Sequence, residues 1–346
     1  MPAYISRPRT VLGAHKVTTS EIIDDIRAHH GAHPRLNALV RAVAGCGVRT
    51  RYFSRPLDEG TVSGDVGITA RVRTDFTDAL ELAEQAAVFA LDTAGLVATD
   101  VDAIVTTHST GWSVPNLDVA LMSRLGMRPS ARALAVTSAA CTGGTKSLVR
   151  ASEMVAARPG STVLVVAAEI LSAVYHHSDS TIESMIYKAL FGDSAAAAVV
   201  SDVPVTAGFA IEDSFEHILP DTAERLAGRI DADGIHFDST KQGRNSSKEV
   251  LPVLQDWLGP RRSDFAVIHP GSPRIITDTA AALDLDDHAA RHSTATLTDE
   301  GNLGGVSVLR VLERTHDEPP RPGARGTAVA YGPGFTTAAL HGHWHA

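Results

Sequence analysis

Cysteine, long apolar runs and low-complexity stretches are all scarce or missing in this sequence of 346 residues. Only Cys46 and Cys141 are present, which excludes a disulfide-rich scaffold and is typical of a reducing compartment. No stretch approaches the roughly 20 apolar residues that a membrane-spanning helix needs, and residues 1–7 have no apolar core of a secretion signal. We therefore expect a cytoplasmic globular protein without a membrane partner.

Positive charge is also in deficit, with 31 Lys and Arg against 40 Asp and Glu and a net charge of −9. This balance disfavours nucleic acid as a partner. One segment departs from it, because residues 31–57 contain no acid and five arginines. These are Arg35, Arg41, Arg49, Arg51 and Arg55. The segment fits either a site for a polyanionic ligand or a solvated helix face with its arginines paired to acids elsewhere.

Strand-like and helix-like patterns alternate along the chain, which predicts an α/β fold with a largely covered sheet. Helical periodicity is expected over residues 75–95, 142–157, 182–189 and 272–283. Apolar strands are expected at 101–107, 132–136, 162–168, 195–200, 209–211, 265–268 and 326–330. Residues 231–248 are rich in Gly, Ser, Asp and Lys and are expected to form an exposed loop or hairpin.

Cys141 lies between the strand at 132–136 and the helix that follows it. Unpaired N–H groups and the positive end of the helix dipole stabilise a thiolate there, which is how a nucleophile is presented. His269 ends the strand at 265–268, and Asn302 precedes a helical stretch through Val308 and Leu312. Taken singly, a cysteine is more often an inert buried residue, and the other two are more often structural.

Together, Cys141, His269 and Asn302 resemble the Cys-His-Asn set of the chalcone synthase and stilbene synthase family, the type III polyketide synthases. Residues 47–52 (GVRTRY), 189–196 (ALFGDSAA) and 331–335 (YGPGF) extend the resemblance over nearly the whole chain. The resemblance implies the thiolase fold, two similar α/β halves in a five-layer αβαβα arrangement. Residues 1–204 would form the half carrying the nucleophile, and residues 205–346 the half carrying the histidine and asparagine.

The resemblance also implies a reaction, that of a decarboxylating acyltransferase. Cys141 would carry an acyl group from a CoA thioester and extend it with malonyl-CoA or a substituted malonyl-CoA. His269 would pair with the thiolate and donate to the oxyanion, and Asn302 would stabilise the enolate. No cofactor beyond the CoA thioesters and no metal is implied. Three alternatives stay open: a ketoacyl synthase III type enzyme that condenses once, an acyltransferase without decarboxylation, and a non-catalytic thiolase-fold partner subunit.

Further positions follow from the same resemblance. Tyr175 and Phe237 would be aromatic gatekeepers between a CoA tunnel and the cavity, although both also fit ordinary core aromatics. Val114 would reach into a neighbouring subunit, which implies a homodimer, and Gly304 and Trp112 would shape the cavity. Within the arginine-rich segment, Arg35 and Arg41 would bind CoA phosphates. The starter, the number of extensions and the ring formed stay open, with a pyrone or a resorcinol-type product plausible and the sequence more like the bacterial members.

Two histidine groups invite a metal hypothesis. The first lies at helical spacing and the second alternates at the C-terminus: His29, His30 and His33, and His341, His343 and His345. Neither group has the set of acid or cysteine partners that makes a closed site. The sequence therefore assigns no metal site, and the C-terminal set fits a solvated tail.

Overall fold

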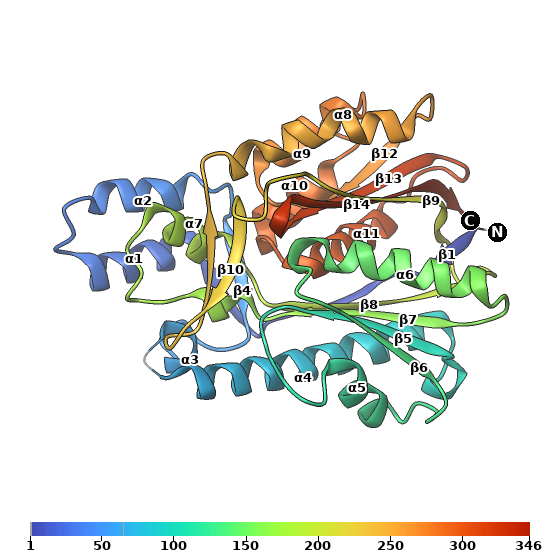
Figure 1. The fold of residues 1–346 in the computed structure, drawn as a ribbon, viewed down its shortest axis with the longest axis horizontal. Coiled ribbons are helices and arrows are strands. Elements are labelled where there is room, and N and C mark those ends of the chain that lie inside the picture. The colour runs from blue at the N-terminus through green and yellow to red at the C-terminus, as the bar shows by residue number, and fades with distance from the viewer. Residues whose placement is uncertain (1, 65) are drawn as a thin grey trace.

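Two halves of one sheet enclose a pair of helices in the computed structural model, which describes residues 2–64 and 66–346 (Figure 1). The strand order is β12-β13-β14-β9-β1-β8-β7-β5-β6, with β2 pairing to β8. The first half consists of β1 (Ala3–Ile5), β2 (Arg9–Leu12), β5 (Ala103–His108), β6 (Arg132–Thr137), β7 (Val163–Glu169) and β8 (Ser194–Ser201). The second half consists of β9 (Gly208–Ile218), β12 (Phe265–Ile268), β13 (Arg325–Gly332) and β14 (Thr336–His345).

The strands form where the sequence has short apolar runs. β5, β7 and β8 are buried along their whole length, as parallel or central strands covered on both faces should be. β5 pairs in parallel with β6 and β7, and β12 pairs in parallel with β13. The two halves join where β1 pairs antiparallel with β9. The predicted boundary between residues 204 and 205 falls in the link from β8 to β9.

The central layer holds α6 (Gly143–Ala157) and α11 (Ser307–Asp317), which lie between the two halves of the sheet (Figure 1). Leu148 on α6 and Leu309 and Leu312 on α11 belong to one core with side chains from both halves. The two helices begin against each other at glycines. A Cβ on Gly144 would lie 2.1 Å from the carbonyl oxygen of Gly305, so only glycine allows this approach. The loops that precede α6 and α11 are thereby brought together.

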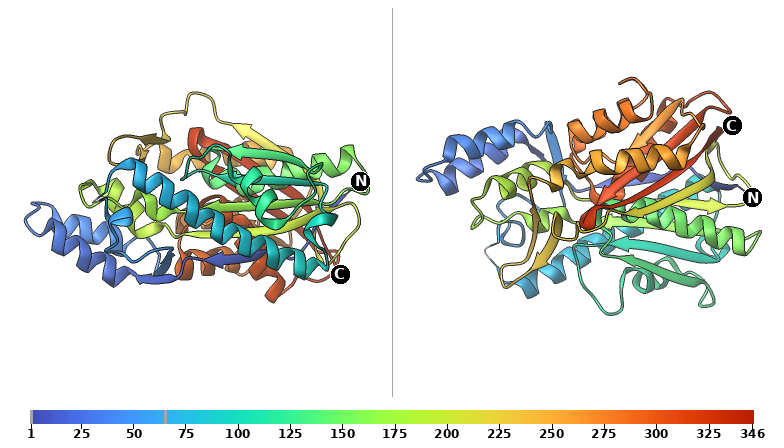
Figure 2. Two further views of the ribbon diagram at one scale, coloured as in Figure 1. Left: turned by 90° about the horizontal axis from the view of Figure 1, so that it is seen from below. Right: turned by 45° about the horizontal axis from the view of Figure 1, so that its top comes forward.

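Helices cover the outer faces of the sheet and complete five layers, as predicted (Figures 1 and 2). One face carries α4 (Ile68–Ala94) and α5 (Leu117–Leu125), and the other carries α8 (Ser246–Leu258) and α9 (Pro273–Ala282). α10 (Arg291–Glu300) contacts α9 and α11. A lobe at one end contains α1 (Thr19–His30), α2 (Leu36–Ala44), α7 (Ile182–Leu190) and the hairpin of β3 (His15–Thr18) and β4 (Thr50–Phe53). A second hairpin pairs β10 (Leu226–Ile230) with β11 (Ile235–Ser239).

Three expectations need correction. α4 begins at Ile68, seven residues before the predicted start. Its first turn includes Arg71, which is buried and whose guanidinium donates to the carbonyl of Ala173 at 2.5 Å. The prediction started too late because a charged residue was not expected on the buried face of the helix. The hairpin expected within 231–248 is present, because this segment contains the turn after β10 and the strand β11, but its last residues belong to α8.

The C-terminal histidines are the third correction, because they belong to β14 and do not form a solvated tail. His341 is fully buried and its Nδ1 lies 3.1 Å from Thr327 Oγ1. Strand pairing of β14 with both β13 and β9 fixes this segment in the sheet. Across residues 2–64 and 66–346, no helix combines the length and apolar character that crossing a bilayer requires.

Candidate active site

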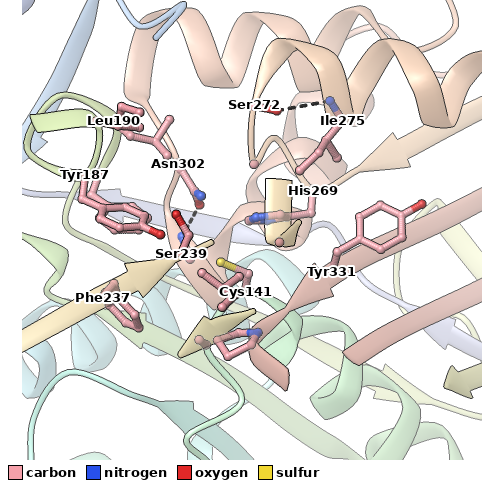
Figure 3. Close-up of a pocket in the computed structure, with 18 of the residues that line it drawn as sticks. Cys141, Tyr187, Leu190, Phe237, Ser239, His269, Ser272, Ile275, Asn302 and Tyr331 are labelled. Atoms are coloured by element: carbon pink, nitrogen blue, oxygen red, sulfur yellow. Dashed lines mark hydrogen bonds between the residues drawn. The ribbon is translucent and has the colours of Figure 1, made fainter. Parts of the chain in front are cut away.

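A cavity of ≈ 540 Å³ lies between the two halves, and Cys141, His269 and Asn302 all line it (Figure 3). The three residues come from the loop before α6, the end of β12 and the loop before α11. Figure 3 shows the His269 ring and the Asn302 amide pointing toward the sulfur of Cys141. The structure therefore brings together the three residues that the sequence analysis selected.

Backbone geometry presents Cys141 to the cavity. The residue sits in a 3₁₀ turn, Ala140–Thr142, between β6 and α6. Ala140 has φ +44°, a left-handed conformation that costs a non-glycine residue about 1–2 kcal/mol. The N–H of Ala140 donates to Ser109 Oγ at 3.0 Å, which holds the turn in place. The sharp turn places the thiol at the N-terminal end of α6.

Asn302 is held so that its amide nitrogen faces the thiol. Its Oδ1 accepts the N–H of Gly304 at 2.9 Å, and its own backbone N–H donates to the carbonyl of Leu190 at 2.8 Å. Because the amide oxygen is occupied, the NH₂ group is the end left for the cavity. That group donates to the sulfur of Cys141 and lowers the cost of a negative charge there.

His269 supplies a neutral imidazole. Its backbone N–H donates to the carbonyl of Val329 at 2.8 Å, which fixes the end of β12. The side chain is buried, and its Nδ1 has no hydrogen-bond partner among the residues that the structure describes. Burial lowers the pKa of His269 to about 3. The ring is therefore uncharged at neutral pH unless a negative charge forms beside it.

Burial also opposes a lone thiolate. It raises the pKa of Cys141 to about 12, with a further contribution from the negative charge of Glu169, against the hydrogen bond from Asn302. The position at the helix N-terminus therefore does not by itself offset the burial of this thiol. Transfer of the thiol proton to His269 creates two opposite charges side by side and leaves the net charge of the cavity unchanged. The ion pair is for this reason the least costly way to form the nucleophile.

Glu169 is a cavity residue that the sequence analysis missed. It ends β7, is fully buried, and its Oε2 accepts the N–H of Ser109 at 3.1 Å. Burial raises the pKa of Glu169 to about 7, so this carboxyl can hold a proton near neutral pH. The signal was present in the sequence, because Glu169 is the only charged residue in an otherwise apolar buried strand.

Aromatic and aliphatic side chains make up much of the cavity wall. Phe237 lines the cavity as predicted, in a cluster with Tyr187 and Phe191 whose ring centroids lie 5.3–6.1 Å apart. Gly304 also lines it. At Gly304, φ is +57°, and a Cβ would lie 3.1 Å from Leu171 and 3.2 Å from Glu169. A side chain at this position would therefore press against Leu171 and Glu169, two other residues of the cavity wall.

Three predicted substrate-binding residues lie elsewhere. Tyr175 is 1% exposed, and its hydroxyl donates to Asp25 at 2.6 Å; it packs with core residues of α1 and α2 and does not line the cavity. The alternative of an ordinary core aromatic describes its place better. Trp112 and Val114 are 72% and 80% exposed and also lie outside the cavity.

The arginine-rich segment divides into two groups. Arg49 pairs with Asp299, Arg55 donates twice to Asp78 at 2.8 and 2.9 Å, and the buried Arg51 donates to a main-chain carbonyl. Arg35 and Arg41 are exposed at the two ends of α2 and do not line the cavity. Arg49 and Arg55 fit the reading of arginines paired to acids elsewhere, and a polyanion site at Arg35 and Arg41 stays a prediction.

Two further cations at the cavity were not foreseen. Lys241, beyond β11, and Arg274, in the first turn of α9, both line it. Arg274 lies five residues after His269 and contacts Asp278 at 3.4 Å. A basic residue in the first turn of the helix after a candidate catalytic histidine is the sequence signal that could have identified it.

Comparison with known proteins finds similar chains over nearly the full length. Residues 48–204 and 210–343 match the family models described as "Chalcone and stilbene synthases, N-terminal domain" and "C-terminal domain". A 1,3,6,8-tetrahydroxynaphthalene synthase of Streptomyces coelicolor is 32% identical over 99% of this chain and 92% of its own length. A phloroglucinol synthase of Pseudomonas fluorescens is 29% identical over 98% of both chains. The solved structure of germicidin synthase from Streptomyces coelicolor, a type III polyketide synthase, superposes with a TM-score of 0.94 at 30% identity and covers 99% of this chain and 100% of its own.

Proposed function

The chain belongs to the chalcone and stilbene synthase family and is a type III polyketide synthase, and we propose that Cys141 carries the acyl chain that it extends. The proposal is supported above all by one observation, the convergence of a thiol, an imidazole and a carboxamide on one cavity. In this proposal residues 1–204 supply the nucleophile, and residues 205–346 supply the groups that activate it and stabilise charge.

Loading begins with transfer of the Cys141 proton to His269. The thiolate attacks the carbonyl carbon of an acyl-CoA, and the carbonyl oxygen becomes an oxyanion that Asn302 and the imidazolium stabilise. The carbon–sulfur bond to CoA then breaks. The departing CoA thiolate takes the proton from His269, which leaves acyl-Cys141, free CoA and a neutral imidazole.

Extension uses the same donors without a strong base. Malonyl-CoA loses carbon dioxide, and the electrons of the broken carbon–carbon bond form an enolate. The enolate oxygen accepts hydrogen bonds from the Asn302 amide and from the N–H of neutral His269. The enolate carbon attacks the acyl group on Cys141, whose thiolate leaves and can be loaded again. No cofactor beyond the CoA thioesters and no metal enters these steps.

Positive charge near the cavity supports CoA as the carrier. We assign contacts with the CoA phosphates to Lys241 and Arg274, which line the cavity, and to the exposed Arg35 and Arg41. Arginine binds phosphate oxygens in a bidentate fashion. Growth of a chain held on CoA would therefore be sensitive to salt, because screening weakens such contacts.

We assign two further roles, one to residues of the cavity wall and one to exposed apolar residues. Phe237 and Gly304 would set the length and folding of the product, which we expect to be a pyrone or a resorcinol-type ring. The exposed Trp112 and Val114 lie in the loop between β5 and α5. Large exposed apolar side chains of this kind fit a contact with a second copy of the chain, so we propose a homodimer.

Product analysis of purified protein tests the function. With malonyl-CoA and a panel of acyl-CoA starters, we expect extended products from the wild type and none from Cys141→Ala. Asn302→Ala should slow malonyl decarboxylation by about 10²–10³, the usual effect of removing one oxyanion donor, and should slow acyl loading less.

The alternatives predict different results. Growth only on a carrier-protein substrate would indicate a ketoacyl synthase III type enzyme. Acyl loading without carbon dioxide release would indicate a simple acyltransferase. No loading at all in a folded protein would indicate a non-catalytic subunit. Equal losses of loading and decarboxylation in Asn302→Ala would contradict the role assigned to its amide.

A further inference from the structure

A second cluster of polar side chains lies in the end lobe, where α1 meets the segment before α7 (Figure 1). Asp25 and His29 are four residues apart on α1 and therefore lie on one face of the helix. His177 comes from the segment between Tyr175 and α7. One ring nitrogen or carboxylate oxygen of each residue lies within 4.8 Å of the others. None of these three residues lines the active-site cavity.

The distances fit ligands around one ion. Nε2 of His177 is 3.2 Å from both carboxylate oxygens of Asp25, and Nδ1 of His29 is 3.2 Å from Asp25 Oδ1. These separations lie at the long end of the range for N–H···O hydrogen bonds. Two ligand atoms each about 2.1 Å from a common metal ion are themselves about 3.0–3.4 Å apart. The two histidine–carboxylate separations therefore match edges of a coordination polyhedron, and the two ring nitrogens lie within 4.8 Å of each other.

The surroundings prepare these groups for an ion. The hydroxyl of Tyr175 donates to Asp25 Oδ2 at 2.6 Å, which orients the carboxylate from behind. The rings of His29 and His177 stack at 3.5 Å with 17° between their planes. The nitrogen lone pairs therefore lie in nearly parallel planes, and one ring must rotate about its side-chain bonds before both nitrogens can point at one ion.

Two features limit the affinity. Nδ1 of His29 also lies 3.0 Å from the main-chain carbonyl of Asp25, and a proton held there must move to Nε2 before Nδ1 can bind an ion. The buried Lys188, whose ammonium lies 5.4 Å from the centroid of the Tyr175 ring, adds a positive charge nearby. We therefore expect binding in the micromolar range, well short of a closed structural site.

We propose that Asp25, His29 and His177 bind one divalent transition-metal ion, with water completing its coordination. Two imidazoles and one carboxylate favour Zn²⁺, Co²⁺ or Ni²⁺ over Mg²⁺ or Ca²⁺, which prefer oxygen ligands. The side chain of His29 is 43% exposed, against 15% for Asp25 and 17% for His177, so water reaches the site from the His29 side. The ion would link α1 to the segment that precedes α7. Residues of α7 form part of the wall of the active-site cavity.

Metal binding to the tag-free, chelator-treated full chain tests the proposal. Calorimetric titration with Zn²⁺ should give one ion per chain. Co²⁺ should give a visible d–d absorption band that Zn²⁺ displaces. Saturating Zn²⁺ should raise Tm by at least about 2 °C, because ligand bound only to the folded state stabilises it. His177→Gln and His29→Gln should each weaken binding at least tenfold.

His33→Gln is the matched control, because His33 belongs to the same histidine run and lies outside the cluster. Its affinity for Zn²⁺ should equal that of the wild type. His29 is partly exposed, so His29→Gln is expected to fold, and circular dichroism verifies this. The proposal is overturned if no binding occurs at 1 mM Zn²⁺, if His33→Gln weakens binding as much as His177→Gln, or if folded His29→Gln binds as tightly as the wild type.

Discussion

The dependence of Cys141 reactivity on His269 gives the sharpest prediction. Replacing His269 by glutamine keeps a hydrogen-bond donor in the cavity and removes the proton acceptor. Without a partner that becomes positively charged, burial dominates and raises the pKa of Cys141 to about 12, against an ordinary cysteine value of 9.0. At pH 7 the thiolate fraction would then be ~10⁻⁵, about a thousandfold below that of a free cysteine.

Alkylation by iodoacetamide measures this fraction. In the wild type we expect Cys141 to react faster than free cysteine at pH 7, with a rate that levels off once the ion pair has formed. In His269→Gln the logarithm of the rate should rise with pH at a slope of one up to pH 10, and the rate at pH 7 should be at least about 10³ lower. Mass spectrometry of the peptide that contains Cys141 gives the rate for this residue alone.

Cys46 provides an internal control in the same samples. It is partly buried, its thiol lies near the carbonyl of Ala189, and burial raises its pKa without any contribution from His269. Its alkylation rate should be the same in both proteins. Equal rates at Cys141 in the two proteins would refute the ion pair. A wild-type rate no faster than that of free cysteine would refute activation of the nucleophile.

Three further predictions follow from particular side chains. Burial raises the pKa of Glu169 from 4.5 to about 7, so its contribution to the free energy of unfolding should fall by up to about 3 kcal/mol as pH rises from 4.5 through 7; the stability of the wild type relative to Glu169→Gln in urea unfolding should fall by this amount, and parallel curves would contradict it. Gly304→Ala should lower the stability more than Gly323→Ala and shorten the products, because both glycines have positive φ but only Gly304 would place its Cβ against neighbours; equal effects would exclude the contact. Phe237→Ala should change the product spectrum measured by mass spectrometry. Tyr175→Phe should instead cost about 1 kcal/mol of stability and leave the products unchanged. A change of products in Tyr175→Phe would show that Tyr175 does affect the cavity.

Local patterns predicted the regular elements that are buried and apolar. The strand at 265–268 has the predicted bounds, and those expected at 162–168 and 195–200 differ from β7 and β8 by one residue at each end. The local sequence is sufficient to predict these strands, because a short apolar run bounded by turn residues can be buried in few ways other than as a central strand. α4 shows where this fails. The burial of Arg71 depends on a carbonyl about a hundred residues away, and nothing near it in the sequence indicates that partner.

The sequence by itself determined which residues could do the chemistry, because Cys141, His269 and Asn302 each stand at the end of an element and match a known set. Only the tertiary structure decided what surrounds them. The contact of Gly144 with Gly305 joins the two loops, Glu169 enters the same cavity, and Tyr175 turns away from it to Asp25. The sequence gives the type and order of these residues directly. The pKa values of the cavity side chains, the shape of the cavity and the cluster at His177 depend on burial and on neighbours from distant segments.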